Sequence, residues 1–209
     1  MAFTGQRGVR MTSREVVEEY GRGRRDFTYV EVAKADFSGM NLEGIRFYGA
    51  RLTGAEFAGT SLLHAQFKDA DLTEADFTGS TLAVSDLIGA RFRGTVFSRV
   101  DFTGAALDGA DCTGADFRGA FLNSVKVEGA HFSGASFDGA RLSRANLSNT
   151  DLGALCGARN LRHDNPCSID AHAVMKSYGH PELYKFMLRC GVPALFAESM
   201  IDCARTLGG

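Results

Sequence analysis

A large apolar side chain returns at every fifth residue over most of this chain. The register starts at Phe27, ends at Leu152 and contains 26 units without an insertion. The central position is Phe or Leu in all but three units, which carry Val32, Cys112 and Val127. A period of five is neither the 3.6 of a helix nor the 2 of a strand. The backbone must therefore return to the same interior every five residues.

The rest of each unit indicates how the backbone does this. A small residue, most often Ala, stands two positions before the centre, and Gly very often stands two positions after it. A short extended segment closed by a turn fits this pattern, since Gly admits the positive φ that the corner needs. One unit cannot bury its own apolar residue, so the units must stack on one another. The prolines all follow the repeat, as expected if its backbone N–H groups are used in a ladder: Pro166, Pro181 and Pro193.

Units of the form A-(D/N/x)-(L/F)-x-G resemble those of the pentapeptide-repeat family, over residues 27–152. The resemblance implies an all-β solenoid, a right-handed quadrilateral β-helix with four units per coil. Large and small side chains would stack inside it. The units would then make about 6.5 coils and a column on the order of 31 Å long, at about 4.8 Å between strands.

Both ends of such a column need caps because open coils expose unpaired strand edges. Residues 1–24 are assigned to a leader with a capping helix. Thr12 and Glu15 fit a capping box, Met11 and Val16 have the spacing of a hydrophobic staple, and Gly21 can end the helix. The β-helix itself is assigned to residues 25–154.

Residues 155–209 predict a C-terminal helical cap or docking segment of two or three helices. One helix is expected between Pro181 and Gly191, with Cys190 on its apolar face, and a shorter one over residues 170–178. A further helix follows Pro193. Its apolar stripe is expected to pack inward and consists of Phe196, Met200, Cys203 and Leu207.

Four units per coil place residues 20 apart above one another, so the surface can be described as columns. One column alternates in charge and is interpreted as structural: Glu31, Arg51, Asp71, Arg91, Asp111, His131 and Asp151. A second, the acidic column, has no cation between its carboxylates: Asp36, Glu56, Asp76 and, after Val96, Asp116. Stacked like charges cost stability. Either a partner uses their field, or Asp is simply frequent before the centre of this repeat.

Two further surfaces are candidates for protein binding. A nearly neutral face carries outward apolar residues, here called the apolar face: Leu63, His64, Val84 and Phe121. The second surface lies in the C-terminal tail, where docking is assigned to Phe186, Leu188, Arg189 and Phe196.

No catalytic or cofactor motif is present, so we expect neither an enzyme nor a cofactor. Cys156, His163 and Cys167 lie within twelve residues, but their spacing matches no zinc module and a fourth ligand is missing, so no metal site is predicted. A formal net charge of −2 argues against direct nucleic-acid binding. The chain has no apolar run long enough to cross a membrane, no signal peptide and no disulfide framework, which predicts a cytoplasmic location.

Three functions remain as hypotheses. The first is an interaction scaffold or adaptor, with a homodimer through a terminal cap as one arrangement, since a solenoid offers long faces and no cavity. The second is implied by the resemblance: some family members imitate DNA, bind DNA gyrase or topoisomerase IV, and protect them from inhibitors. The acidic column would imitate phosphates, although residues 25–154 carry 17 acidic and 12 basic side chains. In the third, the tail resembles the segment that joins such repeats to TIR-type signalling domains, and whether the chain continues past Gly209 is left open.

Overall fold

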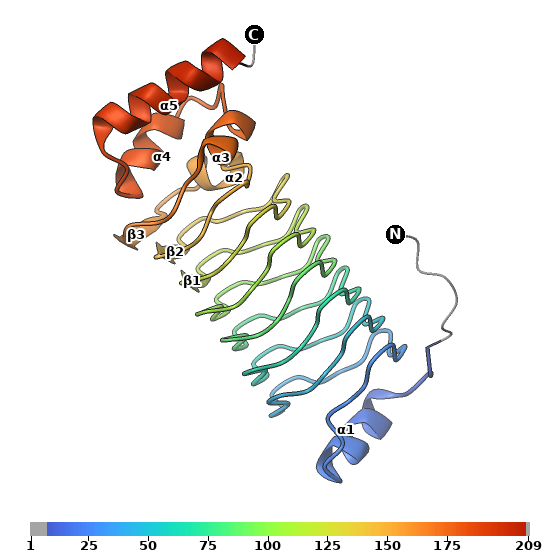
Figure 1. The fold of residues 1–209 in the computed structure, drawn as a ribbon. Coiled ribbons are helices and arrows are strands. Elements are labelled where there is room, and N and C mark those ends of the chain that lie inside the picture. Colours follow the sequence, from blue (N-terminus) through green and yellow to red (C-terminus); the bar gives the residue numbers. More distant parts are fainter. Residues whose placement is uncertain (1–7, 208–209) are drawn as a thin grey trace.

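The computed structural model describes residues 8–207. Stacked coils form one column, with a helix at its N-terminal end and a group of helices at the other end (Figure 1). The elements in chain order are α1 (Ser13–Gly21), β1 (Phe121–Asn123), β2 (Arg141–Ser143), α2 (Gly153–Cys156), β3 (Arg162–Asn165), α3 (Ala171–Lys176), α4 (Leu183–Arg189) and α5 (Ala194–Leu207).

Parallel backbone bridges join residues 20 apart in four columns, which begin at Asp26, Glu31, Asp36 and Asn41. Each coil therefore consists of four units, one per side. This confirms the quadrilateral β-helix and the columns expected from the sequence. The bridges of the acidic column run from Asp36 through Glu56, Asp76 and Val96 to Asp116.

The unit 75–79 illustrates how a unit satisfies its backbone. Four of its N–H groups donate to backbone carbonyls at 2.8–3.1 Å: Ala75 within the turn, and Asp76, Phe77 and Gly79 to neighbouring coils. The fifth, from Thr78, donates to Oδ1 of Asp76 at 2.7 Å. A side-chain acceptor at the position before the centre thus pairs with the one backbone N–H that the ladder and the turn leave free.

The interior contains a ladder of stacked aromatic rings on the side behind the acidic column. Its members, called the Phe ladder, are Phe37, Phe57, Phe77, Phe97, Phe117 and Phe137. Centroids of successive rings are 4.7–5.3 Å apart and their planes differ by 5–29°. Aromatic pairs of this kind add about 0.5–1.5 kcal/mol beyond their buried area. The ladder therefore stabilises the stacking of one coil on the next.

At the N-terminal end, α1 lies across the open coil. The predicted capping box is present: the Thr12 hydroxyl accepts the Glu15 N–H at 3.2 Å, and the Glu15 carboxylate accepts the Thr12 N–H at 2.7 Å. Val16 is fully buried against the core. The sequence did not predict that the leader also extends the ladder, through a bridge between Arg10 and Glu31.

The ladder also runs past residue 154, where the sequence placed its end. β3 pairs in parallel with β2, and Ser168 bridges Asn146. The five-residue register is lost there because the chain inserts α2 and a bulge, so Arg141 pairs with Arg162 instead of a residue 20 further on. A partial coil without the repeat signature therefore connects the column to the helices.

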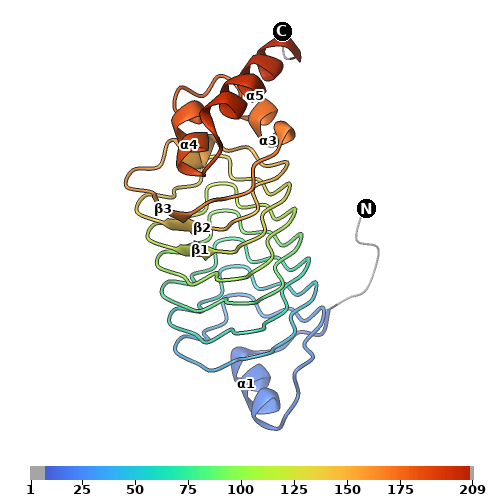
Figure 2. The same ribbon diagram turned by 60° about the vertical axis from the view of Figure 1, so that its left-hand side comes forward.

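The three helices predicted in the tail are confirmed. Asp170 caps α3 by accepting the Ala173 N–H at 2.8 Å. α4 ends at Cys190 as its C-cap, followed by Gly191 at φ +86°. α5 packs against α3 and α4 and lies at the outer end of the molecule (Figures 1 and 2). Among residues 8–207 no helix combines the length and the apolar character needed to span a bilayer.

Buried hydroxyl groups give a test of this packing. Thr60 Oγ1 donates to the carbonyl of Phe37 at 2.8 Å, and three further buried hydroxyls repeat this bond: Ser85, Thr95 and Thr150. Ser80 lies one coil above Thr60, yet its buried Oγ has no hydrogen-bond partner in the described part of the chain. Removing a satisfied hydroxyl costs about 1 kcal/mol, whereas removing an unsatisfied one relieves a desolvation penalty of similar size.

We therefore expect Thr60→Val to lower the free energy of unfolding by about 1 kcal/mol and Ser80→Ala to raise it by up to about 1 kcal/mol. Urea unfolding followed by circular dichroism measures both. Equal destabilisation by the two substitutions would contradict this account.

Candidate interaction surfaces

The structure places all four predicted carboxylates of the acidic column on the outer side of the Phe ladder, one position before its rings. Three of them accept the backbone N–H two residues further on: Asp36 from Ser38 at 2.9 Å, Asp76 from Thr78 at 2.7 Å and Asp116 from Arg118 at 3.0 Å. The Ser38 backbone and side-chain hydrogen bonds also hold the pKa of Asp36 below its usual value.

Neutral side chains make the same hydrogen bond on other sides of the β-helix. The amide oxygens of Asn41 and Asn146 accept from Glu43 and Ser148 at 3.2 and 3.1 Å. An oxygen acceptor is therefore what the turn requires, and a negative charge is not. This supports the structural explanation for the frequency of Asp. Glu56 differs, because no such bond to its carboxylate is found among the described residues.

Asp116 is also neutralised locally. The Arg118 guanidinium lies 2.6 Å from its carboxylate, and the Ser98 hydroxyl donates to it at 3.0 Å. The Arg118 hydrogen bond is the main cause that lowers the pKa of Asp116. The other three carboxylates span two coil spacings, about 10 Å. These carboxylates follow one another at about 4.8 Å, whereas duplex DNA carries one charge per about 1.7 Å. The acidic column therefore has about a third of the charge density of DNA.

The apolar face is not one continuous patch. Leu63 is half-buried, His64 is exposed and Val84 is 54% exposed on the next coil. Phe121 stands two bridges beyond Thr81 in its column, about 10 Å along the axis, and the Arg141 guanidinium covers its ring at 5.5 Å. Phe121 thus lies on the predicted face but is too far along it to join Leu63 and Val84 in one patch.

Val84 itself has an unusual backbone. It adopts φ +55°, and it is the β-branched member of the non-glycine residues with positive φ in the described part of the chain. A β-branched side chain is strained in this region. The same positive φ recurs at the corner of the neighbouring coils, at His64 (φ +58°) and Gly104 (φ +70°), so the repeat imposes this backbone conformation and the strain arises because a valine stands where glycine is usual.

The predicted docking residues of the tail separate into two groups. Phe186 is 1% exposed and packs against the His163 ring, with centroids 5.3 Å apart. Its assignment as a docking residue is therefore wrong, because the side chain is inside the cap. Leu188, Arg189 and Phe196 are exposed.

α5 buries a different face from the one that the sequence predicted. Ala197 and Ala204 are buried, whereas Phe196, Cys203 and Leu207 are exposed and Met200 is half-buried. Small side chains let α5 lie close to α3 and α4, so the alanines take the inward positions. The stripe Phe196, Met200, Cys203 and Leu207, called the α5 stripe, is left largely unpartnered in the described structure.

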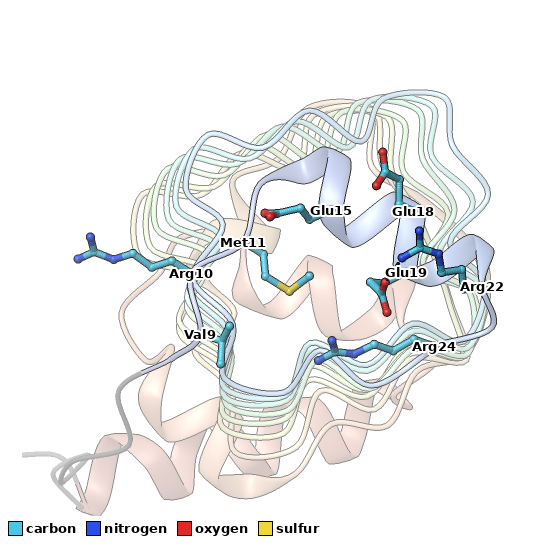
Figure 3. A pocket seen from close by; sticks show the side chains of 8 residues that line it. All are labelled: Val9, Arg10, Met11, Glu15, Glu18, Glu19, Arg22 and Arg24. Atoms are coloured by element: carbon cyan, nitrogen blue, oxygen red, sulfur yellow. Dashed lines mark hydrogen bonds and ion pairs between the residues drawn. The ribbon is translucent and has the colours of Figure 1, made fainter.

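A hollow of about 410 Å³ lies beside α1 at the N-terminal end (Figure 3). Its lining residues are Val9, Arg10, Met11, Glu15, Glu18, Glu19, Arg22 and Arg24. The charged groups around it are engaged with neighbours in the protein, as in the pairs Arg10–Glu31, Arg14–Glu18 and Arg22–Glu19. The hollow therefore does not offer a converging set of free groups to a ligand.

Comparison with known families agrees with this architecture. The family model "Pentapeptide repeats" matches residues 33–62, 50–83, 85–123 and 122–153, in eight copies. The chain belongs to the pentapeptide-repeat family. A search of curated proteins gave no match.

Solved structures similar to this chain include three that are named here, and the first of them supports the fold. HetL, a pentapeptide-repeat protein involved in heterocyst differentiation regulation in the cyanobacterium Nostoc, has 25% identity and a TM-score of 0.53, over 77% of this chain and 81% of HetL. The plasmid-mediated fluoroquinolone resistance protein QnrB1 has 21% identity and a TM-score of 0.39, over 75% of this chain and 92% of QnrB1. A thylakoid-lumen protein of Arabidopsis thaliana has 23% identity and a TM-score of 0.31, over 59% of this chain and 81% of its own.

The turn role of Asp76 can be separated from its charge. Asp76→Asn keeps an oxygen acceptor for the Thr78 N–H, so we expect the free energy of unfolding to change by less than about 0.5 kcal/mol. Asp76→Ala removes the acceptor and is expected to cost about 1 kcal/mol. Chemical denaturation of the two variants measures the difference. If both substitutions cost the same, the charge and not the turn bond stabilises this position.

Proposed function

We propose that this chain is a non-enzymatic scaffold that forms a homodimer through α5 and offers the flat sides of its β-helix to a protein partner. The observation that carries the proposal is the α5 stripe. Phe196 and Leu207 are 63% and 70% exposed at the end of an otherwise well-packed cap. Large apolar side chains in a row favour burial against a partner.

The spacing of the α5 stripe supports a second helix as the partner. Its residues are separated by four, three and four positions, the pattern of a coiled-coil seam. When two copies of α5 run antiparallel about a two-fold axis, Phe196 of one lies opposite Leu207 of the other, and Met200 lies opposite Cys203. Every apolar residue of the stripe then faces an apolar residue, so the seam is complementary to itself.

The position of α5 supports the same arrangement. α5 lies at the outer end of the cap, away from the coils (Figures 1 and 2). A two-fold contact there joins two molecules end to end and leaves the sides of both columns uncovered. The central positions of the repeat units are filled by buried side chains, so recognition by outer surfaces is the use that the column favours.

Phe196→Asp tests the dimer. The substitution places a charge in the seam but disturbs no buried contact, so we expect a folded monomer at concentrations at which the wild type is dimeric. The dimer dissociation constant should rise at least about tenfold, since burying a charge against apolar side chains costs well over 1.4 kcal/mol. Sedimentation velocity over a range of protein concentrations measures this.

Leu195→Ser is the matched control. Leu195 is 75% exposed but points about 100° away from Phe196 around the helix, so its loss should leave the dimer intact. The direction of the helices can also be tested, because Met200→Cys should form an oxidised cross-link with Cys203 of the second copy. A wild type that is monomeric throughout, or equal effects of Phe196→Asp and Leu195→Ser, would contradict the proposal.

A second candidate is gyrase or topoisomerase IV binding through the acidic column, and Glu56 is the observation that favours it. It lies between Asp36 and Asp76 in the column, and its carboxylate accepts no turn hydrogen bond within residues 8–207, so local structure does not explain its charge. Supercoiling by DNA gyrase, measured with and without a quinolone over a range of salt concentrations, tests this function. The function would require the cytoplasmic location that the sequence predicts. Glu56→Gln should abolish any effect that depends on the acidic column, and Asn41→Asp on another side should not.

A further inference from the structure

Three side chains that bind soft metals meet where the last coil joins the helical cap. His163 belongs to β3, Cys167 follows β3, and Cys190 is the C-cap of α4. One imidazole nitrogen and the two sulfurs lie within 4.8 Å of one another. The sequence placed Cys156 with His163 and Cys167, and Cys190 on a packing face. The structure instead brings Cys190 to this group and leaves Cys156 outside it.

Two of these atoms are separated as neighbouring metal ligands are. Cys190 Sγ lies 3.6 Å from His163 Nδ1. In a tetrahedral zinc site, with bonds of about 2.3 Å to sulfur and about 2.0 Å to nitrogen, neighbouring ligand atoms are about 3.4–3.8 Å apart. A cation can therefore enter the group with small side-chain adjustments.

The backbone fixes the three segments in place. The Cys167 N–H donates to the Cys190 carbonyl at 2.9 Å, and the neighbouring Ser168 N–H donates to Ala145 at 2.9 Å. Gly191 approaches Pro166 so closely that a Cβ on it would lie 2.9 Å from the proline ring. The ligands are thus held by main-chain contacts between the column and the cap, which is the preorganisation that a binding site needs.

His163 is an exception in its column. It pairs with Leu142, which pairs with Leu122, and both leucines are core residues. The last coil therefore puts an imidazole where earlier coils put a leucine. Its buried Nε2 has no hydrogen-bond partner within residues 8–207, so hydrogen bonding does not account for a histidine here. The nitrogen that faces a thiol is Nδ1, and a metal bound there would give the imidazole a function and leave the proton on Nε2.

We propose that His163, Cys167 and Cys190 bind a thiophilic closed-shell cation, Zn²⁺ or Cu⁺, that fastens the helical cap to the last coil. The imidazole supplies a neutral nitrogen, and the thiols bind as thiolates after releasing their protons to solvent. Cu⁺ is satisfied by these three ligands, whereas Zn²⁺ takes a water or another exogenous ligand in the fourth position. Since the ligands come from both sides of the junction, binding stabilises the cap.

The test uses the reduced, metal-free full chain. Titration with Co²⁺ as a spectroscopic probe should give thiolate-to-cobalt charge-transfer absorption that saturates at one equivalent and disappears on addition of Zn²⁺. A parallel anaerobic titration with Cu⁺ from a competing chelator identifies which cation binds more tightly. Thermal unfolding with and without the cation measures the effect on stability.

His163→Leu is the decisive variant because it restores the leucine of the preceding coils and should fold at least as well as the wild type. Loss of an outer-shell partner alone costs 10–100-fold in metal affinity, so loss of a ligand should weaken binding at least about 100-fold. The Tm increase caused by the cation should also disappear. Cys167→Ser should behave alike, and His172→Ala, at an exposed imidazole outside the group, should bind as the wild type does.

Three results would overturn the proposal. One is failure of both cations to bind. Another is binding that survives His163→Leu and Cys167→Ser. The third is a Cys167–Cys190 disulfide in the isolated protein whose reduced form takes up no cation, which would make the pair a redox couple instead. The dimer proposed above does not depend on the outcome, since the α5 stripe contains none of the three ligands.

Discussion

The hydrogen bond from each central residue to the next coil is the contact on which this structure depends. Phe77, for example, donates to the carbonyl of Val96 at 2.8 Å, and the same bond recurs along the column. It fixes the rise from coil to coil and thereby places the rings of the Phe ladder at stacking distance. Aromatic stacking and backbone pairing therefore reinforce one another, as expected of a repeat that is stable only in contact with its neighbours.

The hydrogen-bonding needs of the backbone also explain why acidic residues are frequent on the surface of the column. The ladder and the turn use four of the five N–H groups of the unit 75–79, and the fifth needs a short side-chain acceptor before the centre. Asp and Asn meet that need, so acidic residues accumulate on the outside for a structural reason. A functional argument from charge must therefore rest on residues outside this rule. Glu56 is such a residue, whereas Asp36 and Asp76 are not.

Sequence patterns predicted those parts of the fold that have local signals. The five-residue register predicted the column, and Thr12 with Glu15 predicted the start of α1. Parts decided by tertiary contacts were not predictable. The inward face of α5 is set by how closely Ala197 and Ala204 can approach other helices, and large apolar residues in the same helix suggested a different face. The pairing of β3 with β2 was not predicted because the inserted α2 and the bulge break the five-residue register by which the other coils were identified.

The C-terminal end of the molecule contains the features that the repeat does not dictate. Within the column each position has counterparts one coil away, so a feature there tends to follow from the repeat itself. At the C-terminal junction this constraint ends. His163 replaces a leucine, Cys190 arrives from a helix 27 residues further along the chain, and α5 turns an apolar stripe outward. None of these features is needed to continue the ladder. The cap, and not the column, is therefore where the distinguishing chemistry of this chain is concentrated.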